Sequence, residues 1–246
     1  MENAHQVSTD EIDKVRSIGF KIEHTESKYP AEFINEHFAG LEIFAFLNEI
    51  TDLLKPTAEG SLMQTVDMSD TPPPMLLVGL YATDHNDDDR DLIFERSFIR
   101  YPDQLIVEHD YFNLPLSARM QRLSIKVTAC CLKQYINLGV NKIKVHATLK
   151  DGGFIWAKFG FKAIEKAEVT TILNSAKKDL SDHQFNVVER FYKAYYDNEP
   201  NGTNFPMEDW GRLAYMENTL KGSDWHGELD LMNQKDFTNF KNYVTR

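Results

Sequence analysis

Three β-type segments in the middle of the chain, separated only by short turns, constrain the fold most strongly. They span residues 76–83, 92–100 and 104–112, and they are rich in β-branched, aromatic and leucine side chains. An acidic turn, DHNDDDRD, joins the first segment to the second, and Tyr101–Pro102 joins the second to the third. Turns this short connect neighbouring strands that run in opposite directions. The sequence therefore predicts an antiparallel meander.

An amphipathic helix is predicted directly after the meander, over Ser117–Leu138. Its apolar side chains fall on one wide arc when the residues are projected at the helical period, which is typical of a helix packed on a sheet. Gly139 is expected to end the helix in a left-handed conformation. A strand over 142–148, a short helix over 154–159 and a last strand from Phe161 are predicted to follow.

The flanking regions carry a different pattern. Residues 9–55 read as helical, because apolar residues recur at a spacing of about 3.6 until Pro56 interrupts them. Residues 56–75 contain three consecutive prolines and are predicted to form a loop, which is the best candidate for a domain boundary. At least two further helices are predicted in the C-terminal part, near 168–197 and 233–244.

Together these elements predict a mixed α/β protein with a mainly antiparallel sheet flanked by helices. We expect three parts, namely an N-terminal helical segment (1–70), a central α/β domain (71–167) and a C-terminal helical extension (168–246).

The charge balance argues against several classes of partner. The chain carries 38 Asp and Glu against 27 Lys and Arg, a net charge of −11. This charge repels phosphate backbones and anionic lipid, and no run of Lys or Arg offsets it, so neither nucleic acid nor membrane is expected as a partner. The N-terminus is polar and acidic, and no apolar run reaches about 18 residues. We expect a cytoplasmic protein, while delivery into another cell without an N-terminal signal stays open.

The cysteines and histidines predict no metal site. Cys130 and Cys131 are adjacent, so their side chains point in different directions and support neither a disulfide framework nor a cysteine metal centre. Cys131 falls on the apolar arc of the predicted helix and is expected to be a buried, inert thiol. His146 has no partner at metal-ligand spacing and is expected at the surface.

The segment GVNKIKVHATLKDGGFIWAKFGF carries the one resemblance to a known family. It resembles the GNAT superfamily of N-acetyltransferases, in which a helix ending in Gly leads to a strand ending near a small residue. A helix that closes with an aromatic residue, Lys, an apolar residue and Gly-Phe then follows in that family. The matching positions are Gly139, Ala147, Trp156, Lys158, Gly160 and Phe161. The predicted order of elements also agrees, and the resemblance covers about residues 76–165.

The resemblance implies that the protein binds acetyl-CoA or another acyl-CoA. In the family, the pantetheine arm enters between two strands that a bulge forces apart, and the pyrophosphate lies at the start of the long helix. The family loop there is Gln/Arg-x-x-Gly-x-Gly/Ala. The residues implied for the cofactor are Arg119, Gln121, Arg122, Leu123 and Ser124, together with Trp156.

Two of these positions depart from the family pattern. Arg122 stands where the first glycine is expected, so its guanidinium either pairs with phosphate or fills the site. Trp156 stands where the family has the tyrosine that returns a proton to the thiolate, and an indole N–H does not titrate usefully. Aromatic packing is the alternative role of Trp156.

The resemblance also implies a catalytic carboxylate, for which Glu108 is the candidate. In a regular strand Glu108 shares a face with Ile106 and Asp110, whereas His109 and Tyr111 point to the reverse side. His109 is expected to be a packed or hydrogen-bonded core histidine. Tyr135 is the candidate acid, and Tyr111 or solvent are the other possibilities.

Two functions stay open from the sequence. The first is an acyl-CoA-dependent N-acyltransferase, with acetyl as the first choice of acyl group, that acts on an amine of a protein or a small molecule. A basic peptide or a polyamine fits an acidic protein best. The second is a catalytically degenerate member of the superfamily that binds a protein partner. The oligomeric state is not indicated by the sequence.

Overall fold

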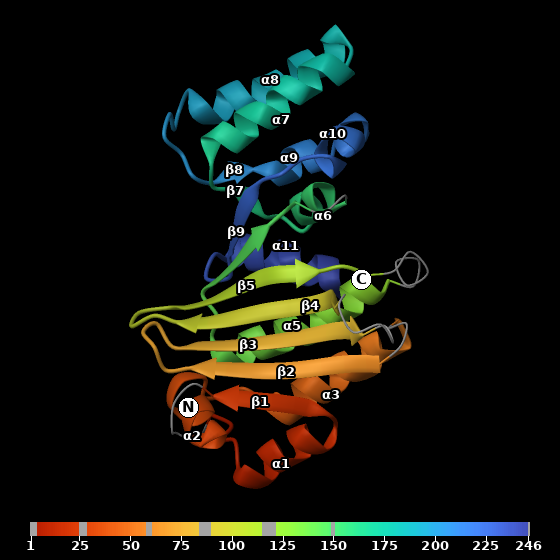
Figure 1. Cartoon of the computed structure of the whole chain (residues 1–246). Coiled ribbons are helices and arrows are strands. Elements are labelled where there is room, and N and C mark those ends of the chain that lie inside the picture. The colour runs from red at the N-terminus through yellow and green to blue at the C-terminus, as the bar shows by residue number, and fades with distance from the viewer. Residues whose placement is uncertain are drawn as a thin grey trace. The chain divides into compact units, whose positions relative to one another are not determined.

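The computed structural model describes residues 4–24, 29–57, 61–83, 90–114, 122–148 and 151–245. The chain forms two compact units, drawn in Figure 1. The first comprises Met1–Asn141 with Lys241–Arg246, and the second comprises Lys142–Phe240. The three-part division at residues 70/71 and 167/168 stays a prediction.

The first unit contains five strands in sequence order. They are β1 (Phe20–His24), β2 (Ser61–Ser69), β3 (Met75–Thr83), β4 (Arg90–Arg100) and β5 (Leu105–Phe112). β1 runs parallel to β2, and every later pair is antiparallel. Strands β3, β4 and β5 confirm the predicted meander.

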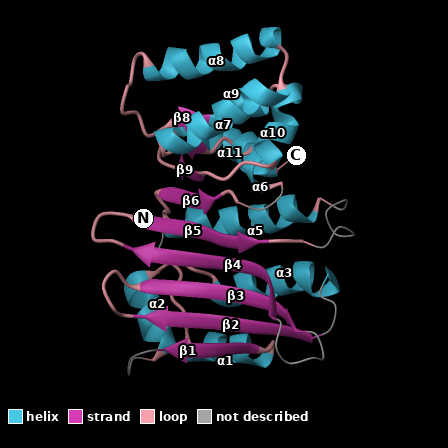
Figure 2. Ribbon diagram, turned by 45° about the horizontal axis from the view of Figure 1, so that its top comes forward, coloured by secondary structure: helices cyan, strands magenta, loops and turns pink. Residues whose placement is uncertain are grey.

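Helices of the first unit pack on one face of these strands (Figure 2). They are α1 (Thr9–Ser17), α2 (Pro30–His37), α3 (Ile43–Leu54), the short 3₁₀ helix η1 (Lys55–Thr57) and α5 (Leu123–Leu138). Alternate residues of β2, such as Val66 and Met68, are buried on this face, and their neighbours are half-buried on the other. We call these the helix face and the open face of the sheet.

Two strands of this unit were missed, and both predictions there were wrong. β1 lies inside the stretch that reads as helical, and β2 lies inside the predicted loop. In β2 the inward position Gln64 is polar, which hides the alternation of buried side chains. Gln64 is nonetheless 4% exposed, because its Nε2 donates to Thr51 Oγ1 of α3 at 2.6 Å. The three prolines are confined to the turn after β2.

The second unit begins with the elements that the sequence pattern predicted. They are β6 (Lys142–His146), α6 (Gly152–Lys158) and β7 (Lys162–Ala163), and Gly139 before them ends α5 with a left-handed φ of 63°. The order of elements from β3 to β7 therefore confirms the predicted succession of three strands, helix, strand, helix and strand.

The rest of the second unit is richer in structure than predicted. Its elements are α7 (Lys166–Asp179), α8 (Asp182–Tyr196), β8 (Phe205–Pro206), α9 (Met207–Gly211), η2 (Ala214–Met216), α10 (Glu217–Lys221), β9 (His226–Asp230) and the part of α11 (Gln234–Val244) up to Phe240. The late strand β9 pairs antiparallel with both β6 and β7, so the predicted helical extension also supplies a strand.

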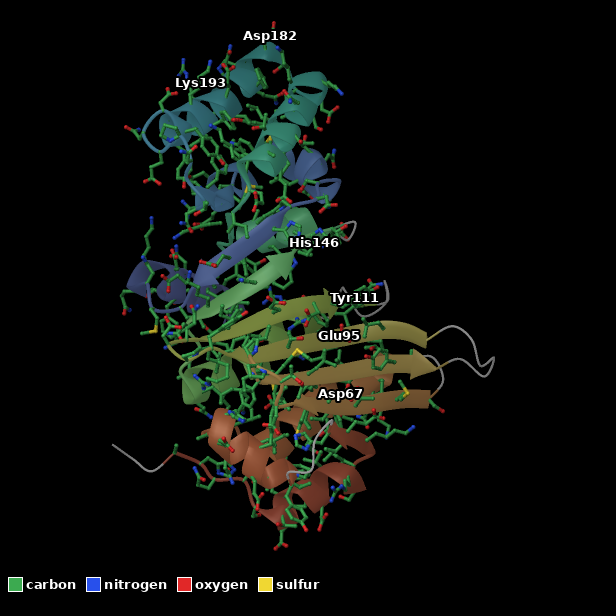
Figure 3. The ribbon with its side chains drawn as sticks, turned by 60° about the vertical axis from the view of Figure 1, so that its left-hand side comes forward. Asp67, Glu95, Tyr111, His146, Asp182 and Lys193 are labelled. Carbon is green, nitrogen blue, oxygen red and sulfur yellow. The ribbon has the colours of Figure 1, made fainter. Side chains whose placement is uncertain are left out.

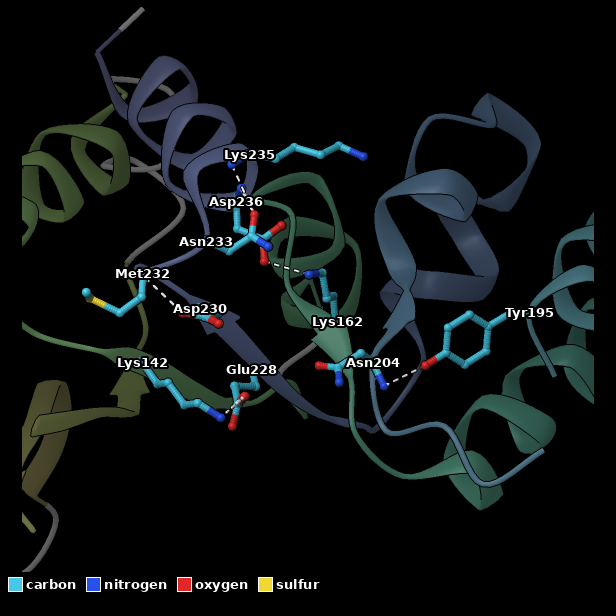
Figure 4. Close-up of polar contacts among 10 residues, drawn as sticks. All are labelled: Lys142, Lys162, Tyr195, Asn204, Glu228, Asp230, Met232, Asn233, Lys235 and Asp236. Atoms are coloured by element: carbon cyan, nitrogen blue, oxygen red, sulfur yellow. Dashed lines mark hydrogen bonds and ion pairs between the residues drawn. The ribbon is translucent and has the colours of Figure 1, made fainter. Parts of the chain in front are cut away.

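Ion pairs hold β9 and α11 to the neighbouring strands (Figure 4). Lys142 Nζ of β6 lies 2.7 Å from Glu228 Oε1 of β9, and Lys162 Nζ of β7 lies 2.6 Å from Asp236 Oδ2 of α11. The core beside them is aromatic, and its fully buried rings are Phe161, Phe205, Trp210, Trp225 and Phe240.

Candidate functional site

A β-bulge interrupts the pairing of β4 with β5. Ser97 pairs with Glu108, whereas Glu95 pairs with Tyr111. Two steps along β4 therefore correspond to three steps along β5, so β5 carries one extra residue at this point. The resemblance predicted a bulge in the sheet, and the register between these strands contains one.

The bulge changes which face Tyr111 occupies. In a regular strand Tyr111 would lie on the reverse side from Glu108, as the sequence predicted. Because of the extra residue, Tyr111 lies opposite Glu95 and on the same open face as Glu108. That part of the prediction was wrong. Figure 3 shows Asp67, Glu95 and Tyr111 along this part of the sheet.

A buried arginine holds the bulge in place. Arg96 is 1% exposed and lies on the helix face. Its Nη1 donates to the carbonyl oxygens of Glu95 at 2.6 Å and Tyr111 at 2.8 Å, so one guanidinium links both strands. The guanidinium also lies 4.5 Å from the ring centre of Phe94 and 5.6 Å from that of Phe112. Sequence reasoning missed Arg96, although an arginine at an inward strand position is itself a signal.

Glu108 is half-buried on the open face of β5. Among the residues that the structure describes, its carboxylate has no hydrogen-bond or ion-pair partner. Glu108 is therefore available to a bound group on this face.

Other polar residues surround it on the same face. Tyr81 Oη donates to Glu95 Oε1 at 3.0 Å. Burial is the main reason why the pKa of Glu95 is raised, and Asp110 adds to it. Burial and the Glu95 carboxylate raise the pKa of Tyr81 to about 12. This face is acidic, and a cationic group would be stabilised there.

Tyr135 lies on the other side of the sheet from Glu108. Its side chain is fully buried on the helix face, and its Oη is 2.8 Å from His109 Nε2. Burial raises the pKa of Tyr135 well above its usual value, and burial lowers the pKa of His109 well below its own. His109 is thus the hydrogen-bonded core histidine that was predicted. The structure does not bring Tyr135 to Glu108, whereas Tyr111 shares its face.

Three of the residues implied for the cofactor, Arg122, Leu123 and Ser124, lie at the start of α5. Arg119 and Gln121 lie outside the described residues. Arg122 caps the helix in the left-handed conformation, with φ 54° and ψ 25°. It is the only non-glycine residue with positive φ among those described. Leu123 is buried, 6% exposed, and Ser124 is half-buried.

The electrostatics at this helix start favour an anion. The first turn of α5 contains no acidic residue, and the exposed guanidinium of Arg122 pairs with none of the described residues. The amides of Leu123 and Ser124 precede the first intrahelical bonds, which run from Ile125 N and Lys126 N to Arg122 O. The start of α5 therefore has two backbone N–H groups that no described residue accepts from, the positive end of the helix dipole and the positive charge of Arg122.

Trp156 belongs to α6 in the second unit. Its ring lies 5.4 Å from that of Phe159 and 5.2 Å from that of Phe161, which is the aromatic packing predicted as its alternative role. Cys130 and Cys131 are buried free thiols, and burial raises the pKa of Cys131 to about 11. Both thiols are buried, as predicted for Cys131.

The second unit contains a histidine pair that the sequence could not reveal. His146 and His226 stack with ring centres 4.1 Å apart, because β6 and β9 pair there. His146 Nε2 lies 2.7 Å from Asp224 Oδ1, and His226 Nδ1 lies 2.7 Å from Glu168 Oε1. Parallel stacked rings do not aim their nitrogens at a common point. Within the described ranges no group of three or more His, Cys, Asp or Glu is arranged to hold a metal ion.

Asp67→Asn is expected to stabilise the protein at pH 7 but not near pH 3. Burial, and then the charge of Glu23, raise the pKa of Asp67 above its usual 3.8. Folding therefore favours the protonated form of Asp67. The resulting contribution to stability is complete below pH 3.8 and is lost as pH rises through the raised pKa. Asparagine is uncharged at every pH, so Tm should rise by roughly 2 °C at pH 7 only. Equal shifts at both pH values in thermal unfolding would contradict this reasoning.

Two further observations concern the whole chain. In the described part of the chain, every helix is too short or too polar to cross a bilayer. Comparisons of the sequence with family models and with curated proteins gave no match.

Proposed function

We propose that the protein transfers an acyl group from acyl-CoA to an amine, as the resemblance to the GNAT superfamily implies. The backbone conformation of Arg122 carries this proposal. The family loop has glycine at the corresponding position, and Arg122 adopts the left-handed conformation that favours glycine. A glycine-like backbone conformation at this one position supports the proposal, although the side chain differs.

Two features of the first unit support the same function. The meander of β3, β4 and β5 leads into α5, which is the order expected of the family. The bulge in β5 follows Glu108 directly and brings Tyr111 onto its face. A carboxylate and a phenol beside an interrupted ladder are suited to proton transfer at a bound amine.

The residues at the start of α5 fit a diphosphate. Leu123 and Ser124 would donate backbone N–H groups, and Arg122 would pair with phosphate oxygens. Of the two predicted roles of Arg122, its exposure favours pairing over filling the site. Acyl-CoA would supply the acyl group as a thioester.

The catalytic roles fall to residues of the open face. Glu108 would accept a proton at its carboxylate from the amine, since no described residue competes for it. Tyr111 Oη accepts a hydrogen bond from Asn113 Nδ2 at 3.4 Å, and its hydroxyl would return a proton on the same face. Glu95, Asp67 and Asp110 add negative charge, which favours a cationic acceptor such as a basic peptide or a polyamine.

Titration calorimetry with coenzyme A tests the proposal. The protein should bind coenzyme A, and Arg122→Glu should weaken binding at least about tenfold because it replaces a phosphate partner by a like charge. Arg16→Glu makes the same charge change on the exposed surface of α1, where Arg16 pairs with Asp13, and should leave binding unchanged.

Absence of binding at millimolar coenzyme A, or equal effects of the two variants, would reject the acyltransferase. The protein-binding alternative would then be the remaining function of the two.

A further inference from the structure

Three segments of the first unit meet at one end of its sheet, at the left in Figure 1. They are the end of α2 at His37, the turn 70–74 between β2 and β3, and the turn 101–104 between β4 and β5. Arg100 ties them together, since its backbone N–H donates to Pro74 O at 2.9 Å and its Nε donates to His37 O at 2.8 Å.

A pocket of about 460 Å³ opens between these segments. Its walls are four proline rings, Pro72–Pro74 and Pro102, and Tyr101. Its polar groups come from Arg100 and His37. This size and this mixture, a mainly apolar wall with few polar groups, are typical of sites for small organic molecules.

Asp70, the carboxylate beside the pocket, is engaged by histidines. Its Oδ1 lies 3.1 Å from His37 Nε2, and its Oδ2 lies 3.3 Å from His24 Nε2. The side chains of His24 and Asp70 are only 8% and 10% exposed. Asp70 therefore fixes His37 at the pocket and is not the counter-ion of Arg100.

Arg100 lacks an anion. Its side chain is half-buried, and its two terminal nitrogens, Nη1 and Nη2, have no hydrogen-bond or ion-pair partner among the described residues. Burial lowers the pKa of Arg100 from its usual value. None of the described residues that line the pocket is acidic. A planar guanidinium with two free N–H₂ groups matches the two oxygens of a carboxylate.

We propose that this pocket binds a small organic acid, whose carboxylate pairs with Nη1 and Nη2 of Arg100 and whose apolar body lies on the proline rings and Tyr101. An inorganic anion would leave the apolar wall wet, and a neutral apolar molecule would leave the guanidinium unpaired. The site shares no residue with Glu108, Tyr111 or the start of α5, so it goes beyond the proposed acyl transfer and does not depend on it.

NMR titration of the ¹⁵N-labelled full chain tests this site. The probes are phenylacetate, its neutral isostere phenylacetamide, and acetate, which has the carboxylate without the ring. We expect saturable shifts of the His37 and Tyr101 amides with phenylacetate. The Kd of phenylacetate should be at least about tenfold lower than those of the other two probes. Phenylacetamide lacks the charge that pairs with Arg100, and acetate lacks the apolar body.

Variants separate the site from general effects. Arg100→Gln should weaken phenylacetate at least about tenfold, whereas Arg16→Gln, an exposed arginine on α1, should not. Since Arg100→Gln also removes the bond to His37 O, Tyr101→Ser provides a second variant, which keeps that bond and should weaken binding several-fold. Equal affinity for acid and amide, no saturation at about 10 mM, or full binding by a folded Arg100→Gln protein would overturn the proposal.

Discussion

Glu108→Gln is expected to slow acyl transfer at least about 100-fold, the low end of what a positioned general base contributes. Glutamine keeps the shape of the side chain but cannot accept the proton of the attacking amine. The binding of coenzyme A should be unchanged, because Glu108 lies on β5 and the diphosphate is proposed to lie at the start of α5. Release of coenzyme A thiol from acetyl-CoA in the presence of spermidine or a lysine-rich peptide measures the rate.

Asp110→Asn is the matched control for this prediction. Asp110 is an exposed carboxylate at the bulge, two residues further along β5, and its substitution removes the same charge. It should change the rate less than about threefold, since it alters only the field around the acceptor. If the two variants have equal rates while both bind coenzyme A, Glu108 is not the base.

Gly153→Ala is expected to lower the free energy of unfolding of the second unit by about 3 kcal/mol. Gly153 is the second residue of α6, and a Cβ there would overlap Leu220 O of α10 and Ser223 Oγ, just after α10. Leu220 O is backbone and cannot turn aside, so α6 or α10 must move. The tryptophans Trp156, Trp210 and Trp225 all lie in this unit, and tryptophan fluorescence during urea unfolding therefore reports on it.

Gly222→Ala is the control for the steric argument. A Cβ on Gly222 would have its nearest neighbour, Asn218 O, at 3.9 Å, which is ordinary contact. Its φ of −93° suits any residue. The change should therefore stay within about 0.5 kcal/mol of the parent protein. If Gly222→Ala lowers the free energy of unfolding as much as Gly153→Ala, helix ends in this region tolerate no side chain even where there is room for a Cβ, and the steric argument is wrong.

The sequence predicted elements whose pattern is local. The meander of β3, β4 and β5 and the amphipathic helix α5 were found because their side chains alternate or recur with a clear period. The prediction missed β2 because the polar Gln64 occupies an inward position. Its hydrogen bond to Thr51 of α3 offsets the cost of burying its amide. β9 was lost because it is polar, and its partners β6 and β7 lie more than 60 residues earlier, as the pairing of His146 with His226 shows.

The candidate site depended on features that a single strand does not encode. Nothing in LIVEHDYF marks an extra residue, because a bulge is a property of two paired strands. Arg96 on β4 bonds the carbonyl of Tyr111 at the bulge, which puts Tyr111 on the same face as Glu108. Tyr135 was predicted as the acid because the sequence does not show that its side chain is buried. Its hydroxyl forms a hydrogen bond with His109. Glu108 and the start of α5 were predicted as site residues through the resemblance alone, and they stay predictions.

The central claim is that the amides at the start of α5 receive the diphosphate of an acyl-CoA. Amide chemical shifts of Leu123 and Ser124, followed by NMR while coenzyme A is added to the full chain, test it most directly. We expect both signals to move progressively and to saturate at the affinity found by calorimetry. If both amides stay fixed while coenzyme A reaches millimolar concentration, no diphosphate is held there, and the claim is wrong.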